Sequence, residues 1–325
     1  MAYTDAQIMM TLAAITYAPA EEIGSYLLPT TNPPNATGGK WALVWGPAVT
    51  DIDEGNLMFV TYNKATHQYA IAIRGTYPYF GLALFVDLYE DLDVGNPLPW
   101  QYPPVPDALV AGGAIDGLND LIQLTSNGMA FHTFVDSQIA SSGADIFITG
   151  HSLGGALTTV LAPWLVDRLS QRNAKSAVCP YTYAAPTAGN AAFASFYTGL
   201  FTNSYRYYNA IDVVPKAWAE LSSIKSLFAP PGPSCPWELK GTIDLVSDWL
   251  SNIDVSYTQP NGGGGSLPGV PSSASDFFAE TLDQHDHNYY LKLLGAPTVP
   301  IAAVPRLRRR SIRRRRTRGA ISGMS

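Results

Sequence analysis

The sequence has few cysteines and no long apolar run. Its 325 residues include only Cys179 and Cys235, too few for a disulfide framework. One bridge is conceivable, but two free, buried thiols are the expectation. No stretch of about eighteen uncharged apolar residues occurs, so no membrane-spanning helix is predicted. The amino terminus lacks a basic region, and residues 5–17 are interpreted as a folded helix and not as a signal peptide. These absences favour a cytoplasmic or non-classically exported protein and leave its location open.

Charge is also scarce, at 14% of residues, and it is unevenly placed. Residues 306–325 hold nine arginines and no acid, which leaves 11 basic and 26 acidic residues in 1–305, a net charge of −15. The sequence thus predicts a folded domain over 1–300 and a basic, disordered tail over 301–325. The tail could contact anionic surfaces or fold back on the acidic body. The acidic body argues against a specific nucleic-acid partner.

What the sequence does contain is a serine in a glycine-rich turn, GHSLGG, between a predicted strand over 145–149 and a predicted helix over 156–169. A serine on a sharp turn between strand and helix is typical of a nucleophile elbow. The strained backbone that such a turn requires at Ser152 explains the small residues Gly150 and Gly154. Ser152 is therefore the candidate nucleophile.

The residue after the serine supplies one hydrogen-bond donor of a predicted oxyanion hole. The backbone N–H of Leu153 would point to where a carbonyl oxygen becomes negatively charged, and the helix N-terminus adds partial positive charge there. A GxSxG pattern alone occurs by chance in about one chain in ten of this length, so the strand and helix around it are what give it weight.

The remaining predicted elements indicate an α/β fold. A long helical region is expected over 115–139, with a break near 126–128. Strands alternate with helices, which favours a mostly parallel central sheet with helices on both faces. The glycine-rich stretch 261–269 is expected to be mobile. The strands are predicted over 41–45, 57–62, 69–73, 145–149, 178–184 and 204–208.

A serine nucleophile needs a histidine base and an acid that orients the histidine, in the chain order Ser, acid, His for this architecture. After Ser152 the only histidines are His285 and His287. Asp212 directly follows an apolar strand, where ligand-binding residues lie in open α/β sheets. Other acids after the serine are in less strand-like settings and are expected at the surface; they are Asp244, Asp248, Asp254, Asp276 and Asp283.

Five segments between about residues 4 and 294 resemble the class 3 lipases, a family of triacylglycerol lipases with the α/β-hydrolase fold. AIRGTYP resembles the oxyanion strand and loop, ITGHSLGGAL the elbow, and YTYAAPTAGN the segment after the next strand. YNAIDVVP is similar to the segment that carries the acid, and DHNYYL to the segment that carries the histidine. Five motifs in the right order are far more specific than any one of them.

The resemblance implies a role for each matching residue. Ser152 would attack an ester carbonyl, Asp212 would orient the base, and Thr76 with the Leu153 N–H would form the oxyanion hole. The family motif places an aromatic residue three positions after the histidine; Tyr290 stands at that offset from His287, so the resemblance favours His287 over His285 as the base. No metal or organic cofactor is implied.

The function implied is a serine carboxylic ester hydrolase, most simply a lipase that forms an acyl-enzyme. A short-chain esterase, a phospholipase A1 or a polyester hydrolase would use the same motifs, and a non-catalytic acyl-binding module is disfavoured by the intact triad. The apolar segment 77–95 occupies the position of the family's lid and could contact a lipid interface. The proline- and glycine-rich residues 216–275 are predicted to form a cap insertion.

Overall fold

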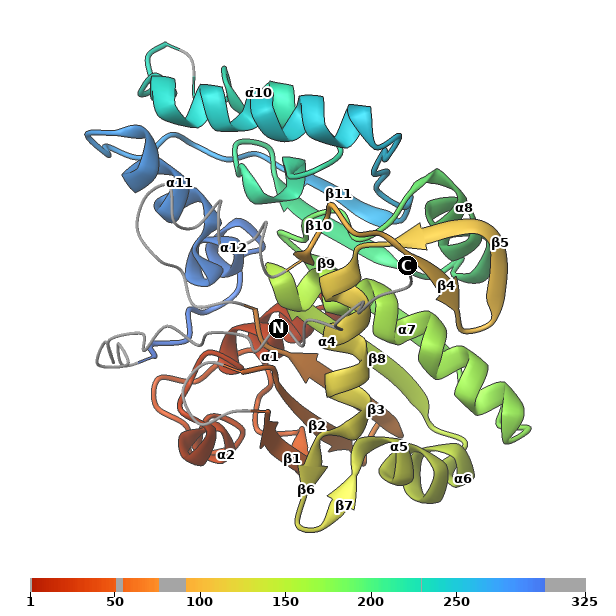
Figure 1. Cartoon of the computed structure of the whole chain (residues 1–325). Helices are drawn as coiled ribbons and strands as arrows, with labels where there is room; N and C mark the ends of the chain where they lie inside the picture. Colours follow the sequence, from red (N-terminus) through yellow and green to blue (C-terminus); the bar gives the residue numbers. More distant parts are fainter. Residues whose placement is uncertain (1, 51–54, 76–91, 229, 302–325) are drawn as a thin grey trace, which may run out of the picture.

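A computed structural model of the chain describes residues 2–50, 55–75, 92–228 and 230–301. Its centre is a seven-stranded sheet in the order β1-β2-β3-β8-β9-β10-β11 (Figure 1). The four pairings from β3 to β11 are parallel, and only β1 and β2 run antiparallel to their neighbours at one edge. The mostly parallel sheet that the sequence predicts is therefore confirmed. The strands are β1 (Ala42–Val49), β2 (Leu57–Asn63), β3 (Gln68–Ile73), β8 (Asp145–His151), β9 (Val178–Tyr183), β10 (Tyr205–Asn209) and β11 (Gly263–Leu267).

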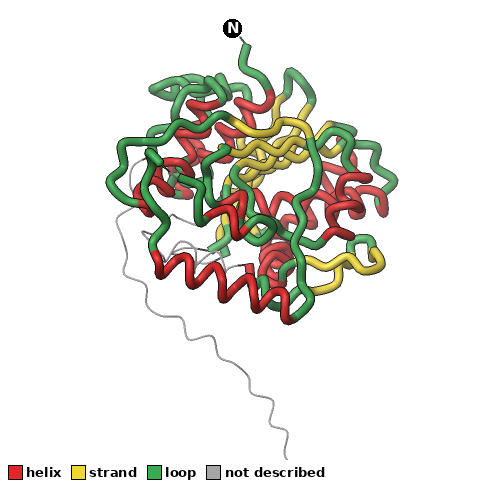
Figure 2. The backbone as a smooth tube through the Cα atoms, turned by 90° about the horizontal axis from the view of Figure 1, so that it is seen from above, coloured by secondary structure: helices red, strands yellow, loops and turns green. Residues whose placement is uncertain are grey.

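Helices cover both faces of this sheet, as Figure 2 shows from above. α1 contacts β3, β8 and β9 on one face, where α12 packs beside it, and α7 lies on the other face with α4 against it. The helices are α1 (Asp5–Ile15), α2 (Ile23–Tyr26), α4 (Gly112–Gln123), α5 (Phe131–Phe134), α6 (Ala140–Ser142), α7 (Leu153–Gln171), α8 (Ala191–Leu200), α9 (Leu221–Ile224), α10 (Trp237–Asn252), α11 (Phe277–His285) and α12 (His287–Leu293).

The core forms two clusters, one on each side of the sheet, because successive side chains of a strand point to opposite faces. On β3, Ala70 belongs to the cluster under α1, and Ile71 belongs to the cluster under α7. On β8, Phe147 and Ile148 divide in the same way. A strand buried on both faces is therefore apolar throughout, which is why these segments read as short continuous apolar runs.

The long helix predicted over 115–139 is interrupted. α4 ends at Gln123, and residues 125–130 form a two-stranded hairpin of β6 (Thr125–Ser126) and β7 (Met129–Ala130). Asn127 and Gly128 both have positive φ, 49° and 76°, as a tight two-residue hairpin turn requires. A second small hairpin pairs β4 (Leu98–Gln101) with β5 (Pro104–Val110). The predicted break at 126–128 is thus a change of structure and not a kink.

The glycine-rich segment expected to be mobile is instead the edge strand β11, which pairs in parallel with β10. Backbone hydrogen bonds need no side chains, and two aromatic rings of β10 cover the bare glycines. A Cβ on Gly263 or Gly264 would lie 3.0–3.1 Å from ring atoms of Tyr205 or Tyr207. Of the predicted cap over 216–275, residues 263–267 therefore belong to the main sheet, while α10 lies apart from it (Figure 1).

Several predicted features fall outside the described residues. They are Thr76, most of the predicted lid over 77–95, and the basic tail from residue 302 onwards. Within the described ranges, no helix is both long enough and apolar enough to cross a membrane.

The two cysteines are free and buried, as the sequence predicts. The Cys179 thiol donates to the backbone carbonyl of Asn203 (2.9 Å), and burial raises its pKa to about 12. Burial also raises the pKa of Cys235. Because the thiolate is the reactive form, both thiols should react slowly with alkylating reagents in the folded protein.

We therefore expect iodoacetamide at pH 8 to alkylate Cys179 and Cys235 at least about 100-fold more slowly in the native protein than in urea. Mass spectrometry of quenched time points measures both rates on the same sample. A reducing agent should leave the melting temperature unchanged. Rapid native labelling of Cys179 would contradict the burial described here.

Candidate active site

The candidate nucleophile lies at a close approach of three backbone segments. Ser152 stands between the end of β8 and the first residue of α7, with φ 61° and ψ −131°, a conformation that L-residues rarely adopt. The residues two positions before and after it must be glycine. A Cβ on Gly150 would lie 2.1 Å from the carbonyl oxygen of Gly154, and one on Gly154 would lie 2.3 Å from that of Ile73. The sequence prediction of a strained elbow at this serine is confirmed.

The Ser152 hydroxyl does not cap the helix that follows it. A serine at this position commonly accepts a hydrogen bond from the second or third backbone N–H of the helix, but no such bond is present here. The hydroxyl instead lies 2.8 Å from Nε2 of His285. The backbone N–H of Ser152 donates to the carbonyl of Tyr183 on β9 (2.9 Å), which fixes the elbow against the next strand.

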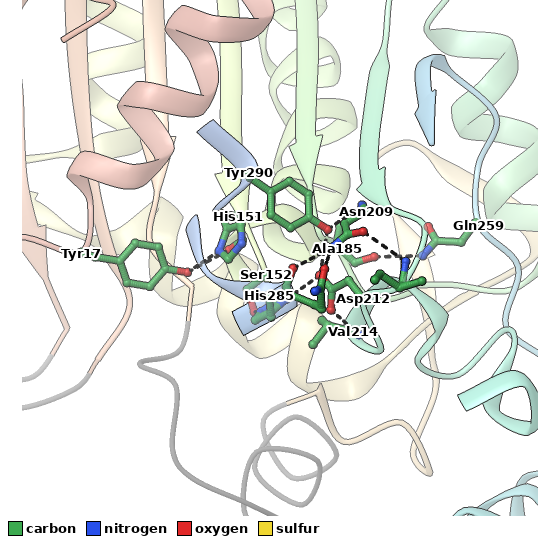
Figure 3. Close-up of polar contacts among 12 residues, drawn as sticks. Tyr17, His151, Ser152, Ala185, Asn209, Asp212, Val214, Gln259, His285 and Tyr290 are labelled. Carbon is green, nitrogen blue, oxygen red and sulfur yellow. Dashed lines mark hydrogen bonds and ion pairs between the residues drawn. The ribbon is translucent and has the colours of Figure 1, made fainter. Parts of the chain in front are cut away.

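An acid completes the chain of contacts. Nδ1 of His285 lies 2.8 Å from Oδ2 of Asp212, in the loop that follows β10 (Figure 3). The same oxygen accepts the phenol of Tyr290 (2.8 Å), and Oδ1 accepts the backbone N–H of Val214 (2.9 Å). All three members are buried: Ser152 is 2% exposed, His285 5% and Asp212 0%. The structure therefore brings Ser152 and Asp212, two of the residues that the sequence singles out, onto opposite sides of one histidine ring.

The prediction that His287 is the histidine beside the serine is wrong. His285 is the last residue of α11, and Asp286 begins α12 as its N-cap, with its carboxylate accepting the N–H of Tyr289. The extended backbone at Asp286 turns the two histidines in different directions, and the His287 ring stacks on Tyr17 instead, with centroids 5.0 Å apart.

The aromatic residue three positions after His287 does not identify the histidine that contacts Ser152. Tyr290 does reach the site, but it does so by bonding to Asp212 from α12, five positions after His285. A sequence signal for a helix boundary was available: aspartate is a preferred N-cap residue, and Asp286 stands directly between the two histidines.

Three histidine rings lie together at the site. The centroid of the His151 ring, on β8, lies 4.7 Å from that of His285 and 6.5 Å from that of His287. Nδ1 of His151 lies 2.9 Å from the Tyr17 hydroxyl (Figure 3). Burial, and then the neighbouring histidines, hold the pKa of His151 well below its usual value. Burial likewise lowers the pKa of His287. His151 and His287 are therefore neutral packing partners of the site.

The predicted oxyanion hole is only partly within the described residues. Leu153 is the first residue of α7, so its N–H has no acceptor within the helix and lies beside the nucleophile. Gly75, at the end of the strand that leads to Thr76, is packed against the elbow: a Cβ there would lie 2.5 Å from the His151 carbonyl oxygen and 3.0 Å from Ser152 Cβ. Thr76 itself lies outside the described residues.

The sequence motifs do not include a set of buried polar residues that hydrogen-bond to His151 or join β10 to α11. Tyr17, in the turn that follows α1, contacts His151. Asn209, Gln284 and Glu280 connect β10 to α11. No motif distinguishes them, because only their burial in the folded protein sets them apart. In the described part of the chain, no group of three or more His, Cys, Asp or Glu residues is arranged to hold a metal ion.

Known proteins share this architecture. Residues 83–221 match the family model "Lipase (class 3)". The structure superposes on the crystal structure of M37 lipase with a TM-score of 0.78 and 27% identity, over 90% of this chain and 94% of that one. Lipase ZK262.3 of Caenorhabditis elegans is 30% identical over 139 residues, which cover 43% of this chain and 30% of that protein. The chain thus spans about a third of that curated relative. The α/β-hydrolase fold and the resemblance to class 3 lipases are confirmed.

The depressed pKa values predict how stability depends on pH. Unfolded histidine binds a proton below about pH 6.5, whereas buried His151 and His287 resist protonation. The unfolded state therefore binds more protons below that pH, and the free energy of unfolding should fall as the pH drops, by up to about 1.4 kcal/mol per pH unit for each residue.

Replacing His151 by Gln removes one of these groups. Urea unfolding of the wild type and of His151→Gln at pH 5, 6, 7 and 8 gives the difference between the two proteins, in which shared carboxylate effects cancel. We expect the wild type to lose stability more steeply below about pH 6.5. Parallel profiles for the two proteins would show that His151 titrates normally when folded.

Proposed function

We propose that this protein, whose residues 83–221 match the class 3 lipase family, is a serine carboxylic ester hydrolase that acts through an acyl-enzyme. The observation that carries the proposal is the continuous chain from Ser152 Oγ through the His285 ring to Asp212, with both contacts at 2.8 Å. A non-catalytic acyl-binding module would have no need of a buried serine–histidine–carboxylate chain.

The reaction proposed follows from these contacts. His285 Nε2 takes the proton of Ser152 as its oxygen attacks the ester carbonyl, and Asp212 stabilises the imidazolium that forms. The Leu153 N–H supports the negative carbonyl oxygen, and Thr76 is the second donor that the family resemblance implies. His285 then gives its proton to the leaving alcohol. Water, deprotonated by the same histidine, attacks the acyl-serine and releases the acid.

The substrate proposed is a medium- or long-chain acyl ester such as a triacylglycerol. The apolar sequence of the lid segment over 77–95 favours this over a short-chain ester, a phospholipid or a polyester. The described end of the segment is firmly held: Leu92 and Val94 are fully buried, and the Val94 carbonyl accepts the phenol of Tyr257 (2.6 Å). We also propose that the arginine-rich tail contacts anionic surfaces.

The histidine assignment gives a direct test of the mechanism. Ser152→Ala should lower kcat by several powers of ten, on the order of 10⁶, and His285→Ala should be nearly as damaging because serine and base act as a unit. His287→Ala should cost far less, since its ring contacts Tyr17 and not the serine.

Hydrolysis of p-nitrophenyl butyrate measures all three variants, and a fluorophosphonate probe followed by peptide mapping should label Ser152 alone. A larger loss in His287→Ala than in His285→Ala, or labelling of a different serine, would overturn the assignment.

The choice between lipase and esterase rests on the lid segment. Burying one large apolar side chain stabilises by about 1.5–3 kcal/mol. Three or four such side chains, buried in lipid when the segment opens, could therefore shift the closed-to-open equilibrium by the roughly 5.5 kcal/mol of a near-complete switch. We expect activity on a medium-chain ester to rise sharply above its solubility limit. Leu84→Asp should blunt the rise and leave hydrolysis of a soluble acetate ester largely intact.

Rates measured across the solubility limit, with p-nitrophenyl esters of two to sixteen carbons, decide this. A smooth saturation curve that is the same in wild type and Leu84→Asp would identify an ordinary esterase.

A further inference from the structure

A buried amide lies directly behind the acid of the proposed triad. Asn209 is the last residue of β10 and has no exposed surface. Its side-chain NH₂ donates both to the backbone carbonyl of Gln284 (3.0 Å) and to its side-chain oxygen (2.7 Å). Its side-chain oxygen accepts the N–H of Ile211 (3.1 Å), and its backbone carbonyl accepts that of Asp212 (3.1 Å). One residue thus shapes the turn that carries the acid and also holds α11.

The partner of this amide is the residue immediately before the base. Gln284 is 1% exposed, and its side-chain NH₂ donates to the Val270 carbonyl and to Oε1 of Glu280, both at 2.8 Å. Its backbone carbonyl is the group that Asn209 holds, one peptide unit from His285. The orientation of Gln284 therefore bears directly on where the His285 ring lies.

A buried carboxylate holds that glutamine in turn. Glu280 is fully buried, one helical turn before Gln284. Its three hydrogen-bond partners are neutral groups: the Gln284 side chain, the Ser272 N–H (2.9 Å) and the Ser272 hydroxyl (2.7 Å). A buried acid is costly unless its oxygens are satisfied. The proposed reaction makes no use of it, and its contacts lead through Gln284 to Asn209.

We propose that Asn209, Gln284 and Glu280 are positioning residues that set the separation between His285 and Asp212. The acid and the base come from segments 73 residues apart. Besides the contact between Asp212 and His285 itself, the side chain of Asn209 joins these segments through its two hydrogen bonds to Gln284. Glu280 fixes the rotamer of Gln284, and Gln284 presents its carbonyl and amide oxygens to Asn209. This inference rests on the proposed function, because it assigns a role within the same site.

The expected effect is on chemistry and not on substrate binding, since none of the three residues contacts Ser152 or the oxyanion-hole residue Leu153. A displacement of about 1 Å in a catalytic group can cost on the order of 100-fold in rate. Asn209→Ala should therefore lower kcat for p-nitrophenyl butyrate about 10- to 100-fold and change KM less than about twofold. The rate of inactivation by a fluorophosphonate should fall by the same factor as kcat.

The matched control lies on the same helix. Thr281 is 5% exposed on α11, and its hydroxyl donates only to the Phe277 carbonyl, outside this network. Thr281→Val should lower the melting temperature and leave kcat unchanged. Fluorophosphonate end-point titration counts the folded, competent enzyme in each preparation. If Asn209→Ala does not fold, Gln284→Met serves as the second variant, with the same expected split between kcat and KM.

Two substitutions of Glu280 separate the effect of its hydrogen bonds from the effect of its charge. Glu280→Gln can still accept from the Ser272 N–H and Gln284, and its NH₂ can donate to the Ser272 hydroxyl, so it should restore most of the kcat that Glu280→Leu loses. An unchanged kcat in Asn209→Ala, an equal loss in Thr281→Val, or an equal loss in Glu280→Gln and Glu280→Leu would each overturn the proposal. A wild-type protein that neither hydrolyses esters nor takes the probe would instead overturn the proposed function.

Discussion

The close approach of backbone around Ser152 is the constraint on which the site depends. The end of β3, the elbow itself and the start of α7 meet where no side chain fits, and glycines stand at each point of contact. This packing holds the serine at φ 61°, a conformation that costs of order 1–3 kcal/mol and persists only because its surroundings allow no other. The same geometry places the Leu153 N–H beside the serine, so one strained residue positions both the nucleophile and a donor for the oxyanion.

The acid and the base reach this serine from the other side, through two layers of hydrogen bonds. Asp212 is held by Val214 and Tyr290 as well as by His285, so its carboxylate has no freedom to turn away. Behind it, Asn209 joins the acid's turn to the end of α11. Buried polar networks of this kind are stable only when every member is satisfied, and these contacts satisfy one another across segments far apart in the chain.

The two histidines that pack near His285 are neutral. His151 and His287 pack near His285, and burial lowers the pKa of both, so neither adds a positive charge beside the imidazolium that the proposed reaction forms. Tyr17 links this cluster to α1, through its hydroxyl to His151 and through its ring to His287. The amino-terminal helix is thereby part of the structure that supports the site, although it contributes no candidate catalytic residue.

The sequence by itself determined the features that are local. The elbow at Ser152 was predictable because glycine is required within two residues of it, and Asp212 because an acid after a parallel strand lies at the edge where ligands bind. The mostly parallel sheet followed from alternating elements. Only the tertiary structure places His285 and not His287 against Ser152, because two residues two positions apart can face different ways once a helix cap lies between them. It also decided that Gly263, Gly264 and Gly265 belong to a sheet strand, since the tyrosine rings that cover the glycines come from β10. It decided as well that Glu280 and Asn209 lie buried in one hydrogen-bond network with Gln284, since burial and distant partners leave no mark on local pattern.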